Sequence, residues 1–314
     1  MNTRPWRLIF MGTPAFALPS LEALLAAGEE VAAVVTQPDK PRGRGRKVSP
    51  MPVKDLALAW NLPVLQPTHL KDPEFVAALQ AYDPELMIVV AYGRIIPREI
   101  LALPTVGVLN VHASLLPRYR GPAPINWSLI RGDRETGVTI QWVKFAVDTG
   151  EIFLQERVPI LAEDNAGALA RKLSERGAVL LVKALEMLHR GEASRQVQDE
   201  AAATYAPLIT PELRRLDWEV PAADAANRIR GLDPRPGAYT LRQGQVLKLF
   251  GAGVKRSSGR LAAPGTVLRL ASQGLEIACG EGSIFVAELQ MANHKRLAAP
   301  EFLRGQPLIN EVLG

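Results

Sequence analysis

The chain has 314 residues, a length that favours two domains over a single core. Its apolar fraction of 47% and charged fraction of 22% are ordinary for a folded protein and exclude extended disorder and coiled coil. The net charge of +5 favours an anionic partner without identifying it.

The single cysteine, Cys279, excludes an internal disulfide and a cysteine-clustered zinc site, and we expect it to be a small buried side chain. The apolar run 8–11 is too short for the core of a signal peptide. No stretch approaches the ~20 apolar residues of a membrane span. These features predict a cytoplasmic protein without a membrane partner.

The first 189 residues alternate apolar runs with amphipathic segments. Because this rhythm is typical of β-α-β units, it predicts a mostly parallel, Rossmann-like α/β sheet. The expected strands are 8–11, 31–35, 64–65, 86–91, 106–111, 138–145 and 152–158. The expected helices are 19–27, 53–60, 74–81, 122–131 and 165–189.

Residues 190–207 are polar and rich in alanine, and we interpret them as a linker. The remaining residues, 208–314, carry short strand patterns separated by glycine-containing turns, with one helix before them at 222–232. This spacing predicts a small β-barrel of the OB type. The expected strands are 239–241, 246–250, 265–270, 275–278 and 284–289.

Two polar side chains stand at the end of a predicted parallel strand. Asn110 and His112 are two residues apart, so both point to the same face of the sheet. The crevice beyond the carboxyl ends of parallel strands is where open α/β sheets bind ligands. An amide and an imidazole there could both donate to a developing oxyanion. Alternatively, the histidine only caps the sheet edge.

Asp148 lies in a turn, Asp148-Thr149-Gly150, and could reach the same crevice. A carboxylate beside an imidazole favours the charged ring and can relay a proton. Asp and Gly are also ordinary turn formers, so the turn alone is weak evidence. An aspartic-protease pair is excluded, because no second Asp-Thr-Gly or Asp-Ser-Gly occurs.

A segment after the second predicted strand is basic and broken by glycine and proline. It cannot be a helix interior, so we expect a flexible loop beside the crevice. Such a loop could neutralise the phosphates of a nucleic acid, or could be a solvated charged surface. Its cations are Lys40, Arg42, Arg44, Arg46 and Lys47.

Taken together, these motifs resemble the folate-dependent formyltransferase family. The resemblance rests on the order and spacing of Asn110-Val111-His112, Ser114-Leu115-Leu116-Pro117, Arg118-Tyr119-Arg120-Gly121 and Asp148-Thr149-Gly150. It implies that Asn110, His112 and Asp148 are the catalytic residues. It also implies a folate-binding wall made of Ser114, Leu115, Leu116, Pro117, Val89, Ala91 and Tyr92.

The resemblance extends over nearly the whole chain and implies a tRNA-acting member of the family. Its expected reaction moves the formyl group of 10-formyltetrahydrofolate to the α-amino group of methionyl-tRNA, the charged initiator tRNA. The basic loop would then meet the acceptor end of the tRNA. We expect no NAD, because the further glycines of a dinucleotide fingerprint do not follow Gly12. We expect no catalytic metal, because His69, His189 and His294 lack spaced ligand partners, and we expect a monomer. A small amine acceptor, a non-catalytic RNA-binding role and hydrolysis to formate remain as alternatives.

Overall fold

The structure is a computed structural model that describes residues 4–42, 47–49 and 51–314. The chain divides into two compact units that interleave along the sequence. The first unit is Met1–Pro122, Thr136–Val158 and Ala170–Ala206; the second is Ala123–Glu135, Pro159–Leu169 and Pro207–Gly314. Short-range sequence patterns do not report this interleaving, and the limits predicted above stay a prediction.

The first unit is built on a seven-stranded sheet in the order β5-β2-β1-β6-β7-β8-β9. The pairs from β5 to β7 are parallel, and β8 joins β7 in antiparallel orientation. The predicted mostly parallel α/β sheet is therefore confirmed. The strands are β1 (Arg7–Gly12), β2 (Glu30–Val35), β5 (Val64–Leu65), β6 (Leu86–Val90), β7 (Gly107–His112), β8 (Glu135–Trp142) and β9 (Ile152–Pro159).

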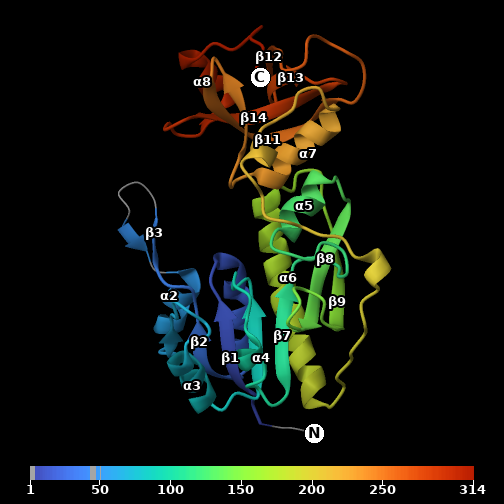
Figure 1. The fold of residues 1–314 in the computed structure, drawn as a ribbon. Helices are drawn as coiled ribbons and strands as arrows, with labels where there is room; N and C mark the ends of the chain where they lie inside the picture. The colour runs from blue at the N-terminus through green and yellow to red at the C-terminus, as the bar shows by residue number, and fades with distance from the viewer. Residues whose placement is uncertain (1–3, 43–46, 50) are drawn as a thin grey trace. The chain divides into compact units, whose positions relative to one another are not determined.

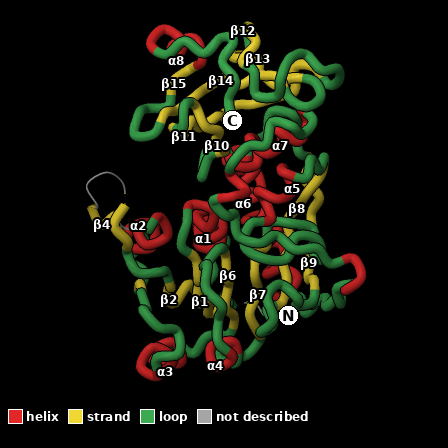
Figure 2. The backbone as a smooth tube through the Cα atoms, turned by 45° about the horizontal axis from the view of Figure 1, so that its top comes forward, coloured by secondary structure: helices red, strands yellow, loops and turns green. Residues whose placement is uncertain are grey.

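Both faces of the central strands are buried. All residues of β6, and those of β1 after Arg7, are buried, and alternate residues of a strand point to opposite faces. Ile9 and Met87 belong to a cluster that packs against α3 (Pro73–Ala81) and α4 (Arg98–Leu101). Figure 2 shows these helices on one side of β2, β1 and β6, and α1 (Leu18–Ala26) on the other. This double coverage explains why the central strands are continuous apolar runs.

The remaining helices of the chain are α2 (Pro52–Ala59), α5 (Pro124–Ile130) and α6 (Ala166–His189) before residue 190, and α7 (Ala222–Leu232) and α8 (Ala299–Gly305) after it. Proline stands in the first turn of α1, α2, α3, α5 and α8, where its missing N–H costs no hydrogen bond. The one-turn α4 and the short α8 were not predicted, because a single turn leaves too little periodicity to detect.

The basic segment is not a loop throughout. Its two flanks form a hairpin, β3 (Lys40–Arg42) with β4 (Lys47–Ser49), and Arg42 pairs with Lys47. The expectation of a loop was therefore wrong at these two flanks. Glycine and proline content weakens a strand pattern, and each of these short strands depends on pairing with the other.

The segment expected to be a linker packs on the first unit. Gln196 exchanges main-chain hydrogen bonds of 2.8 and 2.9 Å with Ile152, and Tyr205 forms a bridge with Arg120. The short helix η2 (Glu200–Ala202) lies between them. We call residues 196–206 the strap, because they run along the first unit before the chain enters the second at Pro207.

The second unit contains an antiparallel β-sheet in the order β10-β11-β14-β13-β12, with β15 paired to β14. This agrees with the predicted second β domain. Helices α7 and α8 contact its strands (Figure 1). The strands are β10 (Ala238–Arg242), β11 (Gln245–Arg256), β12 (Val267–Ala271), β13 (Gly274–Ala278), β14 (Ser283–Met291) and β15 (Leu297–Ala298).

The core of the second unit includes Cys279, which is fully buried as expected. Burial raises the pKa of its thiol to about 12, so the group stays protonated and acts as an apolar side chain. Across the described part of the chain, we find no helix with the length and apolarity needed to cross a membrane.

Candidate active site

Asn110 and His112 lie at the carboxyl end of β7. In the strand register Asn110 stands opposite Val89 of β6 and Gln141 of β8, and His112 stands opposite Thr139. Side chains of directly paired residues point to the same face of a sheet, so one face carries four polar side chains from two neighbouring strands. No hydrogen-bond partner of the Asn110 side-chain amide is present within residues 4–42, 47–49 and 51–314, so its N–H groups can donate to a ligand.

The His112 ring has an acceptor near each of its nitrogens. Its Nε2 lies 3.0 Å from the main-chain oxygen of Tyr119, and its Nδ1 lies 3.6 Å from Oδ1 of Asp148. A carbonyl oxygen only accepts, so Nε2 carries the proton and donates it to Tyr119. This leaves Nδ1 as the nitrogen that faces the carboxylate and any substrate. The two side chains are only 7% and 12% exposed, so water screens their interaction little.

Asp148 is fixed through both of its carboxylate oxygens. Oδ2 accepts from the N–H of Gly121 at 2.9 Å, and Oδ1 accepts from Nε2 of Gln141 at 2.7 Å. The backbone of Asp148 has a φ of 52°, in the left-handed region that costs energy for residues other than glycine. The structure therefore brings Asp148 to His112, as the sequence predicted. Because the backbone of Asp148 is strained, contacts with neighbouring residues must stabilise this turn.

The turn at residues 148–150 is held by close packing at Gly150 and by hydrogen bonds from Gln198. The ideal Cβ of residue 150 would lie 1.6 Å from the carbonyl oxygen of Trp142, so only glycine fits there. From the strap, Nε2 of Gln198 donates to the carbonyl oxygens of Asp148 and Gly150, at 2.9 and 2.7 Å. Arg120 in turn donates to Oε1 of Gln198 from two of its nitrogens, at 3.0 and 2.8 Å.

The turn predicted to contact folate directly follows His112. Ser114 is buried and donates to the carbonyl oxygen of Arg118 at 2.6 Å, and the bond between Leu116 and Pro117 is cis. The Thr139 hydroxyl donates to Ser114 O at 2.7 Å, so strand β8 fixes the turn. Leu115 and Pro117 are half-buried and Leu116 is buried. Contact of this turn with folate stays a prediction.

Three further residues predicted for the folate wall lie at the end of β6. Val89 and Tyr92 are buried in the core cluster that packs against α3 and α4. Ala91 is exposed and has a φ of 47°. The main-chain oxygen of Tyr92 accepts from Gln37 at 2.8 Å. Burial raises the pKa of the Tyr92 phenol. These positions suit contact through backbone and Cβ atoms more than through the Val89 and Tyr92 side chains.

The predicted tRNA-binding residues fall on the hairpin after β2. Lys40 and Arg42 belong to β3, and Lys47 belongs to β4; only their backbone is described. Arg44 and Arg46 lie outside the described residues. Their role stays a prediction.

Sequence reasoning missed Gln141, Gln198 and the role of Arg120. A signal for Gln141 exists: Thr139 and Gln141 alternate with apolar residues in β8, so they share one face. A single buried arginine, 2% exposed in the structure, gives no such signal, because its partners are about 80 positions away.

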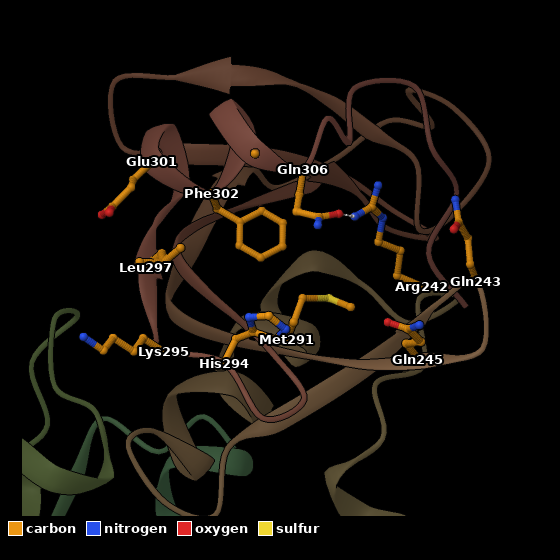
Figure 3. Close-up of a pocket in the computed structure, with 11 residues that line it drawn as sticks. Arg242, Gln243, Gln245, Met291, His294, Lys295, Leu297, Glu301, Phe302 and Gln306 are labelled. Atoms are coloured by element: carbon orange, nitrogen blue, oxygen red, sulfur yellow. Dashed lines mark hydrogen bonds between the residues drawn. The ribbon is translucent and has the colours of Figure 1, made fainter.

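A separate cavity of about 380 Å³ lies in the second unit, and Figure 3 shows Met291 and Phe302 among its lining side chains. Arg242 also lines it but is engaged by Gln306 and by both carboxylate oxygens of Glu311. Where the chain is described, no group of three or more His, Cys, Asp or Glu side chains is placed to hold a metal ion.

The comparison with known proteins decides the family. Residues 6–185 match the formyl transferase family model, and residues 208–307 match the model of the formyl transferase C-terminal domain. The chain belongs to the formyl transferase family. The family resemblance predicted from the sequence is thereby confirmed, and with it an enzyme of formyl transfer.

Relatives within the formyl transferase family agree along the length of the chain. The methionyl-tRNA formyltransferase of Moorella thermoacetica is 50% identical over 309 residues, which cover 98% of this chain and 99% of that enzyme. Solved structures share the fold at lower identity. HypX from Aquifex aeolicus, in complex with tetrahydrofolic acid, superposes with a TM-score of 0.69 at 21% identity, over 96% of this chain and 47% of that longer one. WlaRD, a sugar 3N-formyl transferase, superposes with a TM-score of 0.68 at 17% sequence identity, over 93% of this chain and 100% of that one.

Proposed function

We propose that this formyl transferase moves the formyl group of 10-formyltetrahydrofolate onto the α-amino group of methionyl-tRNA, and that it acts as a monomer in the cytoplasm. The product would be the formylated initiator tRNA used to begin translation. The full-length similarity to methionyl-tRNA formyltransferases supports this acceptor. The observation that carries the chemistry is the placement of Asp148 beside His112, on the sheet face that also bears Asn110.

In the proposed mechanism, the neutral amino nitrogen attacks the formyl carbon and forms a C–N bond. The carbonyl electron pair moves to oxygen, and this oxyanion is stabilised by donors already in place. The Asn110 amide donates one hydrogen bond. His112 donates another from Nδ1, because Nε2 is already bonded to Tyr119.

Asp148 has two roles in this scheme. Its negative charge, 3.6 Å from Nδ1, stabilises the positively charged ring that donates to the oxyanion. It also accepts, through water, the proton that the nucleophilic nitrogen loses. Collapse of the tetrahedral intermediate then breaks the bond between carbon and the folate nitrogen, and this nitrogen takes up the proton that Asp148 had accepted. One C–N bond is formed and one is broken, the proton returns from Asp148, and no oxidant or reductant is needed.

The hairpin β3–β4 supports a polyanionic acceptor. It follows β2, whose carboxyl end lies at the same edge of the parallel sheet as those of β1, β6 and β7. Its cations would neutralise phosphates of the tRNA, while Asn110 and His112 face the charged end. A small amine acceptor would not require these cations.

A formyl-transfer assay tests the proposal. Purified protein and 10-formyltetrahydrofolate are mixed with methionyl-tRNA, free methionine, uncharged tRNA or an amino sugar. Formylation of methionyl-tRNA alone is the expected result. Transfer to the amino sugar but not to methionyl-tRNA would overturn the acceptor, and release of formate without transfer would show a hydrolase.

A further inference from the structure

We propose that Gln141 is a positioning residue for the reaction: its amide holds the Asp148 carboxylate in the orientation that serves His112. The inference rests on the role given to Asp148 under the proposed function. It adds a residue to which neither the motif resemblance nor the family membership assigned a role.

The contact is short and buried. Nε2 of Gln141 donates to Oδ1 of Asp148 at 2.7 Å, and the Gln141 side chain is almost completely buried in β8. Oδ1 is also the oxygen that lies 3.6 Å from the His112 ring. The amide is oriented unambiguously, because a carboxylate oxygen accepts and the carbonyl end of the amide cannot donate to it.

The other end of the same amide has no partner. Oε1 of Gln141 is buried and unbonded among the residues that the structure describes. A buried acceptor that has lost its water and gained no donor destabilises the folded state. The cost of the unbonded Oε1 offsets the hydrogen bond that the amide donates to Asp148, so the net contribution of this glutamine to stability is small. Its orientation of the Asp148 carboxylate is what distinguishes it from an apolar side chain of equal length.

The geometry explains why a donor is required. The Gly121 N–H fixes one carboxylate oxygen, which leaves the group free to swing about that contact. Gln141 fixes the second oxygen, from the position opposite Asn110 in the strand register. Two donors from two chain segments define the plane of the carboxylate. Its distance to the ring is then set before substrate binds, which is where catalytic groups gain most from being held.

The test replaces the amide by an apolar side chain of the same length. For Gln141→Met we expect kcat to fall by roughly tenfold to a hundredfold, with KM for both substrates within about threefold of wild type. We expect the melting temperature to change little, because removal of the unbonded Oε1 offsets the hydrogen bond that Asp148 loses. A purely structural residue would give the opposite pairing, with lower stability and unchanged kcat.

A second variant separates donation from packing. Gln141→Glu keeps the shape and places a carboxylate against Asp148, so kcat should fall further at neutral pH. Because the introduced carboxyl can donate once protonated, its rate relative to wild type should recover as the pH is lowered from about 8 to about 6. Gln80→Met is the control. Gln80 is an exposed residue of α3, so its loss removes an amide that donates neither to Asp148 nor to the turn at Ser114–Pro117.

Unchanged kcat in Gln141→Met would overturn the inference, as would a fall in kcat that tracks a lower melting temperature. Asp148→Asn distinguishes this failure from failure of the proposed function. If Asp148→Asn is inactive while Gln141→Met is fully active, only the positioning role is lost. If Asp148→Asn is itself active, the carboxylate has no role to be positioned for, and the assignment of the site fails.

Discussion

The Nε2 atom of His112 lies 3.0 Å from the carbonyl oxygen of Tyr119, so one of the two ring nitrogens is occupied by the protein's own backbone. The nitrogen left for chemistry is Nδ1, which faces Asp148. Tyr119 itself has a φ of 61°, so this carbonyl is presented by a left-handed residue. The distinction between the two nitrogens can be tested by substitution.

The amide nitrogen of asparagine can replace Nδ1 of His112, and that of glutamine can replace Nε2. We expect His112→Gln to lose about 10²–10³ in single-turnover rate, the usual cost of one oxyanion donor. His112→Asn should retain more activity than His112→Gln, although it lacks the ring's charge. Asn110→Ala should lose a similar factor to His112→Gln, with folate affinity little changed. If His112→Gln is the faster of the two histidine variants, the reacting nitrogen is Nε2 instead.

Substitution of Gly150 should reduce activity by displacing Asp148, although Gly150 itself supplies no reacting group. A methyl group at this position would overlap the carbonyl oxygen of Trp142, so the turn that carries Asp148 must move. We expect Gly150→Ala to reduce kcat by about a hundredfold or more, because small displacements of catalytic groups are costly. Gly305→Ala is the control, since its Cβ would meet no neighbour. Activity equal to wild type in Gly150→Ala would show that the position of the turn is not critical.

The buried guanidinium of Arg120 is linked through Gln198 of the strap to the turn at residues 148–150. It donates to Gln198 and, in a bidentate pair, to Glu200 at 2.8 Å from each of two nitrogens. Arg120→Met should leave Oε1 of Gln198 without its donors and cost about 1–3 kcal/mol in the free energy of unfolding. The rate should fall too, as Gln198 loosens its hold on Asp148. Arg190→Met, at an exposed pair with Glu192, should leave both measurements unchanged.

Acid should weaken the second unit through Glu276, a buried carboxylate. Burial raises the pKa of this group, but hydrogen bonds from Arg269 and Ser283 and the charges of Arg269 and Arg256 outweigh burial and lower the pKa below 4.5. A carboxyl with a lowered folded-state pKa stabilises the fold above its unfolded value and loses this contribution as the pH falls through the folded value.

Denaturant unfolding at a series of pH values checks this expectation. Glu276→Gln should be less stable than wild type at neutral pH, and the difference should shrink as the pH falls below 4.5. A difference that stays constant with pH would mean that the carboxylate charge contributes nothing.

The hairpin cations should appear in the salt dependence of tRNA binding. Each phosphate contact adds about 0.9 to the slope of log K against log salt concentration in duplex nucleic acid, so Arg42→Ala should make the slope shallower by about 1. Arg190→Ala provides an exposed arginine of the first unit as control. An unchanged slope for Arg42→Ala would indicate that this arginine is only a solvated surface residue.

Most helices and strands of the fold were predicted because their apolar runs or helical periodicity lie within each element itself. The central strands β2, β1 and β6 contain continuous apolar runs, and the two-residue spacing of Asn110 and His112 placed both on one face of β7. Strand β11 was predicted shorter than it is, since Gly251 and Gly253 interrupt its pattern. The Phe285 ring lies against Gly253, so a Cβ at this position would require the ring to shift.

The rest of the candidate site depends on contacts that span the chain. Gln141 is brought into the site by the register of β8 against β7. Gln198 is brought to Asp148 by the path of the strap. The strap has no apolar periodicity, because main-chain and side-chain hydrogen bonds hold it in place of a packed helix face. Local patterns therefore predicted a linker at 190–207 and gave no sign of the hydrogen bonds by which Gln198 supports the backbone of Asp148.

The path of the strap fixes how small an active fragment can be. The sequence pattern suggests trimming the chain at the end of α6, near His189. Such a fragment would keep Asn110, His112 and Asp148 and lose Gln198, whose amide donates to the backbone of the turn at residues 148–150. We therefore expect the shortest piece that keeps the proposed site intact to extend to about residue 206, so a fragment or graft should be cut after the strap.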